Sequence, residues 1–209
     1  MSEPLLHRFN LLERIIHWVV GVTYVALLLT GLAFAYPPLF WLTAPLGGGA
    51  MARVLHPYIG ALFGVAMLLM VVLWIRDMFL NRLDVQWMAA VHHYATHQRD
   101  KVPPAGKYNA GQKLFFWVQG VLAIVFVATG VMLWFPEQFA PARTLLSSAR
   151  LLHYIATLGG GLFLVLHVYL GTVAYPGTAR SMIDGKVTRQ WARLHHPRWH
   201  EEQTGLTDT

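Results

Sequence analysis

The chain has 209 residues, of which 56% are hydrophobic and 12% are charged, and its formal net charge at pH 7 is +6. Because an average soluble domain has about 25% charged residues, this composition excludes a disordered chain and argues against a soluble enzyme. The length fits one domain over residues 1–209. The sequence contains no cysteine, so disulfides, thiolate metal sites and covalently attached c-type haem are excluded, and eleven histidines remain as soft nitrogen ligands.

Four long segments contain no Lys, Arg, Asp or Glu, and each is long enough to cross a hydrocarbon core of about 30 Å as a helix. They are Ile15–Tyr36, Val54–Ile75, Leu114–Phe135 and Leu151–Tyr175. A cleaved signal peptide is the alternative for the first segment, but its apolar stretch is longer than such peptides have. The sequence therefore predicts an all-α integral membrane protein with four transmembrane helices in an up-and-down bundle.

The basic residues give the expected orientation of this bundle. Thirteen of the sixteen Lys and Arg residues lie before the first span, between the second and third spans, or after the fourth span. If the helices alternate in direction, these three segments face one side, which the positive-inside rule identifies as the cytoplasm. We expect both termini in the cytoplasm, a cytoplasmic tail over residues 176–209, and contacts with anionic lipid rather than nucleic acid.

The cytoplasmic loop and the tail carry further expected helices. Val85–His97 is expected to form a helix on the membrane surface, which Pro103-Pro104 would end, and Thr178–His195 a second, basic interfacial helix. We expect the histidines of these segments to be solvated or, in the tail, to contact a partner. These are His92, His93, His97, His195, His196 and His200.

Four histidines lie inside the apolar spans, where an ionisable side chain is expensive and suggests a function. His17 begins the first span near the cytoplasmic side, whereas His56 and His153 begin spans two and four near the opposite side. His167 follows His153 by fourteen residues, about 21 Å along a helix and on nearly the same face. The spacing predicts one histidine pair per leaflet, His56 with His153 and His17 with His167. Two bis-histidine b haems require this arrangement; neutral histidines that hydrogen-bond between helices are the alternative.

A small residue follows each of these histidines by four positions on the same helical face. The four are Gly21, Gly60, Thr157 and Gly171. They would leave room for a flat macrocycle, although small residues also allow close helix packing in membranes. The cytoplasmic pair matches in depth only if the first helix is tilted or begins nearer Leu11.

Five motifs at matching spacing make the chain resemble the cytochrome b (gamma) subunit of respiratory formate dehydrogenases. They are Arg14–Trp18, Arg53–Pro57, Gly106–Lys113, Met182–Val187 and His195–Trp199. The loop motif and the tail are more specific than the histidines, which the cytochromes b of hydrogenase and thiosulfate reductase share in outline. The resemblance implies a multi-pass protein of the bacterial inner membrane, with a catalytic (alpha) subunit carrying a molybdenum or tungsten pterin and an iron–sulfur (beta) subunit as partners.

The same resemblance implies an electron path. Electrons from the iron–sulfur subunit would reach the periplasmic haem of His56 and His153, then the haem of His17 and His167, and then menaquinone or ubiquinone. It assigns Asn109, Gln112 and His167 to the quinone, with Gly111 as a backbone contact. The formate site would lie in the catalytic subunit and not in this chain.

Alternatives remain for the loop motif and for the whole chain. Asn109 and Gln112 have the spacing of a capping box at the start of the third span, and both roles can hold together. The bundle could serve another dehydrogenase, such as hydrogenase, or could be a haem-free transporter or scaffold whose histidines join its helices.

Overall fold

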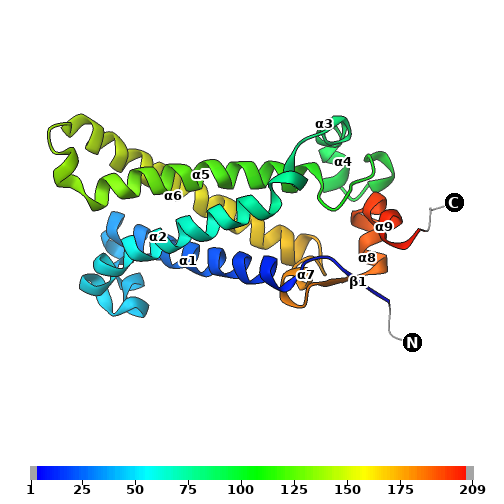
Figure 1. Ribbon diagram of the computed structural model, residues 1–209, viewed down its shortest axis with the longest axis horizontal. Coiled ribbons are helices and arrows are strands. Elements are labelled where there is room, and N and C mark those ends of the chain that lie inside the picture. Colours follow the sequence, from blue (N-terminus) through cyan, green and yellow to red (C-terminus); the bar gives the residue numbers. More distant parts are fainter. Residues whose placement is uncertain (1–3, 206–209) are drawn as a thin grey trace. The chain divides into compact units, whose positions relative to one another are not determined.

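The structure, a computed structural model, describes residues 4–205. Four helices are long and apolar enough to cross a membrane, and they run alongside one another in Figure 1. They are α1 (Leu11–Ala35), α2 (Gly48–Trp74), α5 (Ala110–Trp134) and α6 (Arg143–Tyr169), and α6 continues into a π-turn at Leu170–Ala174. This confirms the all-α membrane architecture predicted from the four apolar spans.

The chain divides into two compact units. One, here called the bundle unit, comprises residues 15–71 and 119–168 and holds most of the four long helices. The other, here called the basic unit, comprises the described parts of residues 1–14, 72–118 and 169–209. All thirteen basic residues of the three segments expected on one side fall within the ranges of the basic unit. These segments therefore gather together, as alternating helices require.

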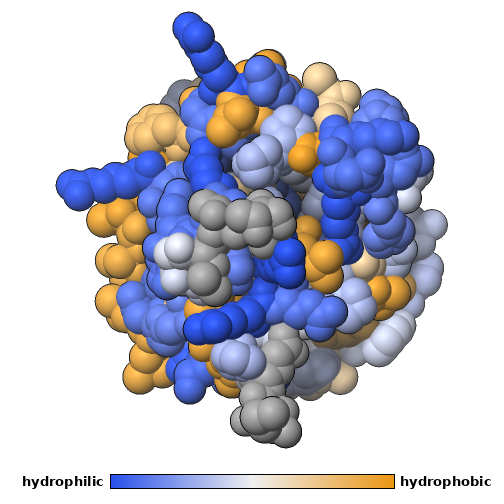
Figure 2. Space-filling view, turned by 90° about the vertical axis from the view of Figure 1, so that its right-hand side faces the viewer, coloured by the Kyte–Doolittle hydropathy of each residue, from blue (hydrophilic) through white to orange (hydrophobic). Residues whose placement is uncertain are grey.

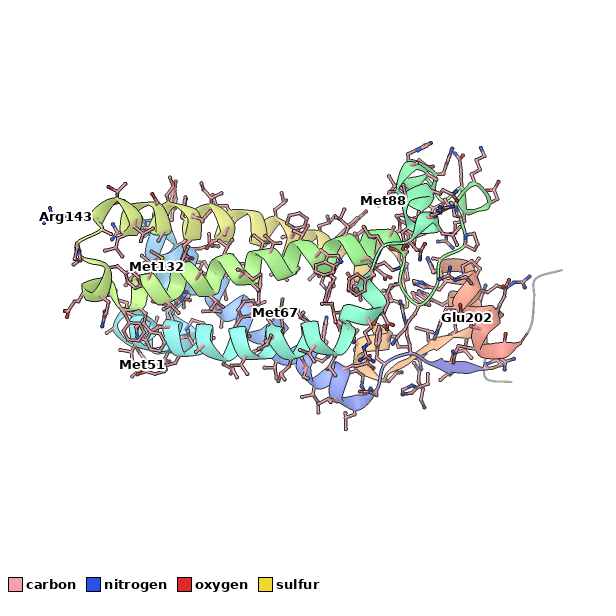
Figure 3. The ribbon with its side chains drawn as sticks, turned by 45° about the horizontal axis from the view of Figure 1, so that its top comes forward. Met51, Met67, Met88, Met132, Arg143 and Glu202 are labelled. Carbon is pink, nitrogen blue, oxygen red and sulfur yellow. The ribbon has the colours of Figure 1, made fainter. Side chains whose placement is uncertain are left out.

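The bundle unit has an apolar exterior. Between 17% and 28% of the residues in the apolar windows of the four helices are buried, and Ile124 and Leu162 are each 70% exposed. Such a surface is suited to lipid. Met51 near the start of α2, Met132 near the end of α5 and Arg143 at the start of α6 lie at one end of this unit (Figure 3). Two 3₁₀ segments, Pro37–Leu46 and Pro136–Phe139, lie between the paired helices at that end.

The basic unit combines short elements from distant parts of the sequence. Strand β1 (Leu5–His7) pairs antiparallel with β2 (Lys186–Thr188), so that Leu6 lies opposite Val187. The helices are α3 (Arg82–Ala89), α4 (Val91–Ala95), α7 (Arg180–Ile183), α8 (Arg189–His195) and α9 (Pro197–Thr204), with 3₁₀ turns at Ile75–Met78 and Arg99–Lys101. Figure 2 shows that the face of the molecule that carries β1, α8 and α9 is largely hydrophilic.

The tail differs from the single interfacial helix expected over Thr178–His195. The helix is interrupted at Gly185, which has a φ of +82°, and a Cβ added there would lie 2.5 Å from the carbonyl oxygen of Phe9. The backbone amides of Arg8 and Phe9 both donate to the carbonyl of Gly185. The glycine thus permits a close turn against the N-terminal segment, and β2 forms there. The loop helix expected over Val85–His97 is likewise divided into α3 and α4 at Ala90.

Arg8 joins the N-terminal segment, the loop and the tail. It is 4% exposed, and its Nη2 donates to the carbonyl oxygen of Lys107 at 2.8 Å and lies 3.2 Å from Nε2 of His196. Its guanidinium lies 4.7 Å from the ring centre of Trp191, within cation–π range. A buried arginine held by a carbonyl, an imidazole and aromatic rings is a point at which three segments are fixed together.

The tail histidines are buried, so the prediction that they are solvated or contact a partner is wrong. His195, His196 and His200 are 7%, 1% and 6% exposed. His196 Nδ1 donates to the carbonyl of Gly106 at 2.7 Å, and His195 lies 3.1 Å from the Tyr94 hydroxyl. The ring of Trp191 packs against both His195 and His196, and the rings of Tyr94 and Tyr175 also lie against His195. In the loop, by contrast, His92 and His97 are exposed, as expected. Among residues 4–205, no three metal-ligating side chains lie close enough together to hold a metal ion.

The buried histidines predict acid sensitivity of the tail. Burial, with Arg99 as the next cause, lowers the pKa of His195 to about 4, and burial beside Arg8 holds the pKa of His196 well below its usual range. The unfolded tail, with histidine pKa values of about 6.5, binds more protons than the folded tail between about pH 6.5 and 4. Stability should therefore fall as the pH drops through that window. Hydrogen exchange of residues 186–204, corrected for its intrinsic pH dependence, should become faster there; equal protection at pH 7 and pH 4 would contradict this.

Candidate functional site

The four membrane histidines form two pairs in the bundle unit. His56 on α2 and His153 on α6 have ring centroids 6.5 Å apart, with an angle of 59° between the ring planes. His17 on α1 and His167 on α6 have centroids 6.1 Å apart, with an interplanar angle of 47°. The structure brings together the same two pairs that depth and helical phase predict. Three of the rings are half-buried, and His167 is exposed.

Helix boundaries account for the depth of the second pair. α1 begins at Leu11, so His17 lies well inside the helix rather than at its start. α6 remains α-helical only to Tyr169, two residues beyond His167. The first helix thus begins where the depth match between His17 and His167 requires.

Two threonines hold the rings of the first pair. The Thr30 hydroxyl of α1 donates to the Ala26 carbonyl at 2.8 Å and lies 2.6 Å from Nδ1 of His56. A hydroxyl has one proton, so when Thr30 donates to the Ala26 carbonyl its oxygen accepts from Nδ1–H of His56. That tautomer leaves the Nε2 lone pair of His56 available to a metal ion.

The same arrangement recurs at the second histidine of the pair. Thr129 of α5 donates to the Val125 carbonyl at 2.6 Å and lies 2.7 Å from Nδ1 of His153. Sequence reasoning missed Thr30 and Thr129, since threonines within membrane helices commonly bond to their own backbone and show no sign of a further partner.

A cavity of about 830 Å³ lies within the bundle unit and is lined by both His56 and His153. Its volume is in the range of cofactor sites. Gly31 and Gly130 also line the cavity. A Cβ added at Gly31 would lie 4.0 Å from Cε1 of His56, and a Cβ added at Gly130 would lie 3.7 Å from Cε1 of His153. Gly60 and Thr157, two of the small residues noted after the histidines, line the cavity as well. A Cβ added at Gly21 or Gly171 would meet nothing within 4 Å.

The spacing of both pairs fits axial ligation of haem iron. A metal–imidazole bond is about 2.0 Å and the ring centre lies roughly 1.1 Å behind the nitrogen, so two rings on opposite sides of one iron would have centroids about 6.2 Å apart. The observed values are 6.5 and 6.1 Å. At the second pair, Nδ1 of His17 is buried without a hydrogen-bond partner among the described residues. Each pair can therefore present two neutral imidazoles to one iron.

The residues assigned to quinone begin α5. Asn109 Oδ1 accepts from the Gln112 amide at 2.9 Å, and Gln112 Oε1 accepts from the Asn109 amide at 3.1 Å. The predicted capping box is thus present. A Cβ at Gly111 would lie 3.3 Å from Asn109 Oδ1, so these three residues lie together in the basic unit. Asn109 is buried and Gln112 half-buried, whereas His167 belongs to the bundle unit.

Comparison with known proteins agrees with this geometry. The family described as prokaryotic cytochrome b561 matches residues 8–185. The chain is 34% identical over 207 residues to the cytochrome b556 subunit of the nitrate-inducible formate dehydrogenase of Escherichia coli K12, across 96% of this chain and 93% of that protein. It is 30% identical over 203 residues to a second formate dehydrogenase cytochrome b556 subunit of that organism, with 96% and 94% covered.

A relative from Haemophilus influenzae, also named a formate dehydrogenase cytochrome b556 subunit, is 31% identical over 193 residues, across 91% of this chain and 80% of that protein. These relatives confirm the resemblance seen in the five sequence motifs. The chain belongs to the prokaryotic cytochrome b561 family.

Proposed function

We propose that this chain is the membrane cytochrome b subunit of a formate dehydrogenase and carries electrons from an iron–sulfur subunit through two b haems to a quinone. Membership of a cytochrome b family implies haem b, and the names of the relatives imply a complex with other subunits. The proposal of two haems rests on the two histidine pairs. In each pair the distance between the ring centroids is that expected for two imidazoles bound to one iron.

Each residue has a role in this proposal. His56 and His153 hold one haem in the cavity of the bundle unit, and Thr30 and Thr129 fix the orientation of their rings. His17 and His167 hold the second haem. When bound, haem iron takes up and releases one electron reversibly, which makes it a relay. His153 and His167 share α6, so one rigid helix sets the spacing of the two sites at about 21 Å along its axis.

The proposed direction of electron flow combines the orientation of the chain, which is inferred from charge, with the resemblance to formate dehydrogenases. The basic unit faces the cytoplasm by the positive-inside rule, which places the pair of His56 and His153 towards the periplasm of a bacterial inner membrane. A catalytic subunit with a molybdenum or tungsten pterin oxidises formate on that side. The quinone, menaquinone or ubiquinone, is reduced near the cytoplasm at Asn109, Gly111, Gln112 and His167. With protons taken from the cytoplasm, turnover would separate charge, and a complex in liposomes should generate a membrane potential.

The first test is a dithionite-reduced minus oxidised spectrum of the purified chain, with a pyridine haemochrome assay for stoichiometry. Two b haems per chain are expected. Properly folded protein that was supplied with haem and contains none would overturn the proposal. Electron donors then identify the partner: formate should reduce the haems of the purified complex, whereas reduction by hydrogen alone would assign the chain to a hydrogenase.

The threonine contacts predict a graded effect on haem binding. Thr30→Val or Thr129→Val removes the acceptor for Nδ1–H, so the affinity for the haem held by His56 and His153 should fall about tenfold or more. The loss should appear as faster haem release to an acceptor such as apomyoglobin. Thr→Ser at either position should preserve retention. Thr23→Val is the matched control, because the Thr23 hydroxyl also bonds to the α1 backbone, at Val19 and Val20; equal release from it would contradict the prediction.

The capping box makes it possible to separate stability from quinone binding at Asn109. Serine is also a good helix N-cap but has no amide NH₂ group. Asn109→Ser keeps the cap and loses the hydrogen bond to Tyr94, so the thermal stability should fall slightly while the rate of quinone reduction falls about tenfold. Haem reduction by the partner subunits should continue at the normal rate. If quinone reduction falls only in proportion to stability, Asn109 acts as a cap alone.

A further inference from the structure

Two arginines line the same cavity as the first histidine pair. Arg53 precedes His56 by three residues on α2, and Arg150 precedes His153 by three residues on α6. Residues three apart lie on one face of a helix. Each helix therefore presents an imidazole and, one turn nearer its N-terminus, a guanidinium to one cavity.

Neither arginine has a charge partner in the described part of the chain. Arg53 and Arg150 form no ion pair and no side-chain hydrogen bond there, and none of the residues that line the cavity is acidic. The sequence places a single carboxylate in the ranges of the bundle unit, Glu137, which is exposed and lies outside the cavity lining. Two like charges beside one cavity repel each other unless an anion is bound with them.

The structure assigns a ligand to this pair: we propose that Arg53 and Arg150 bind the two propionate carboxylates of the haem held by His56 and His153, and that their charge favours its reduced state. The inference rests on the proposed function. A b haem carries its two propionates on one edge, and guanidinium is the side chain best suited to a carboxylate because it donates two parallel hydrogen bonds. Positive charge beside the macrocycle stabilises the added electron.

The assignment is specific to one haem. Arg14 stands three residues before His17, but its Nη1 donates to the Ile183 carbonyl at 3.2 Å and lies near the backbone of Gly185 in the basic unit. His167 has Leu164 at the equivalent position. The pair of His17 and His167 thus lacks two unpartnered arginines at this spacing, and the haems should differ in their response to arginine substitution.

The test is a redox titration of the two-haem protein with Arg53→Gln, Arg150→Gln and the double variant. The haem of His56 and His153 is identified as the signal lost in His56→Ala. At a fixed ambient potential, each single variant should lower the ferrous-to-ferric ratio of that haem about tenfold, equivalent to about 59 mV for one electron. The other haem should titrate as in the unmodified chain.

Arg143→Gln is the matched control. Besides Arg53 and Arg150, Arg143 is the remaining arginine in the ranges of the bundle unit, and it does not line the cavity. Its side chain extends away from the helices at the end of the unit where α6 begins (Figure 3). It should leave both haems unchanged. Arg→Lys at positions 53 and 150 keeps the charge and should keep most of the potential. If a Gln variant at position 53 or 150 loses the haem altogether, retention of the haem in the Lys variant at the same position supports the proposal. An equal loss of haem from the Arg143→Gln control overturns the proposal.

The outcomes separate this inference from the proposed function. An unmodified chain without haem contradicts the proposed function. A double Gln variant with two haems that both titrate normally overturns the propionate assignment and leaves the proposed function intact. In that case the arginines act only as charged ends of helices at the membrane surface.

Discussion

His56→Ala is expected to reduce the haem content from two b haems per chain to one, and His17→Ala should do the same at the other level. Each removes one histidine of a proposed ligand pair, whose rings are 6.5 Å apart at the first pair and 6.1 Å apart at the second. The remaining histidine cannot hold six-coordinate iron alone. The measurement is pyridine haemochrome stoichiometry together with the reduced spectrum, in which each variant should keep a different one of the two components. Electron transfer from formate to quinone should fall to background in both.

His92→Ala is the control for these variants, since His92 is an exposed histidine of the loop between α2 and α5 and should change nothing. The double variant His56→Ala, His153→Ala should contain as much haem as either single variant, because both substitutions remove the same site. Combining His56→Ala with His17→Ala should remove all haem. Two haems retained in the single variants would show that the histidines are structural and would favour the haem-free alternative.

Asp84→Asn is expected to destabilise the basic unit by about 3–5 kcal/mol, because it leaves the ammonium of Lys113 buried without its counter-charge. Lys113 Nζ lies 2.8 Å from Asp84 Oδ2, and their side chains are 8% and 10% exposed. Lys113 also donates to the Phe79 carbonyl at 3.0 Å, which ties the start of α5 to the segment after α2. The measurement is the free energy of unfolding in detergent. A Lys113→Met, Asp84→Asn double variant should recover part of the loss.

The control is an exposed ion pair of the same unit. Arg180 and Asp184 lie 2.7 Å apart with side chains 49% and 38% exposed, so Asp184→Asn should cost no more than about 1 kcal/mol. Equal costs for the two substitutions would show that burial of the Asp84–Lys113 pair has no energetic consequence.

The bundle could be predicted from the sequence because lipid imposes strong and local constraints. Each span must be apolar over its whole length, so the four helices are visible in composition alone. An imidazole in such a span is conspicuous, and helix geometry is regular enough to give the partner of each histidine. The start of α1 at Leu11 is one of the two ways, beside helix tilt, in which the depth of His17 could match that of His167.

The basic unit could not be predicted in the same way. Its buried histidines and the β1–β2 pairing depend on contacts between segments far apart in the chain, such as His196 with Gly106. A polar, basic tail of this composition is compatible with exposure to solvent, and nothing local distinguishes the two states. Thr30 and Thr129 were missed for a related reason, since their function lies in which helix they face rather than in their residue type.

The pairing of β1 with β2 sets an order on the biogenesis of the chain. Leu5–His7 is synthesised before the four membrane helices, but its partner strand, Lys186–Thr188, is made only after all four of them. Arg8 meets His196 later still. Contacts at such sequence separation form slowly, because a long stretch of chain must first be closed into a loop. The N-terminal segment therefore finds its strand partner only after all four helices have been made, and a chain that is cut short before its tail leaves this buried arginine without one of its two hydrogen-bonding partners.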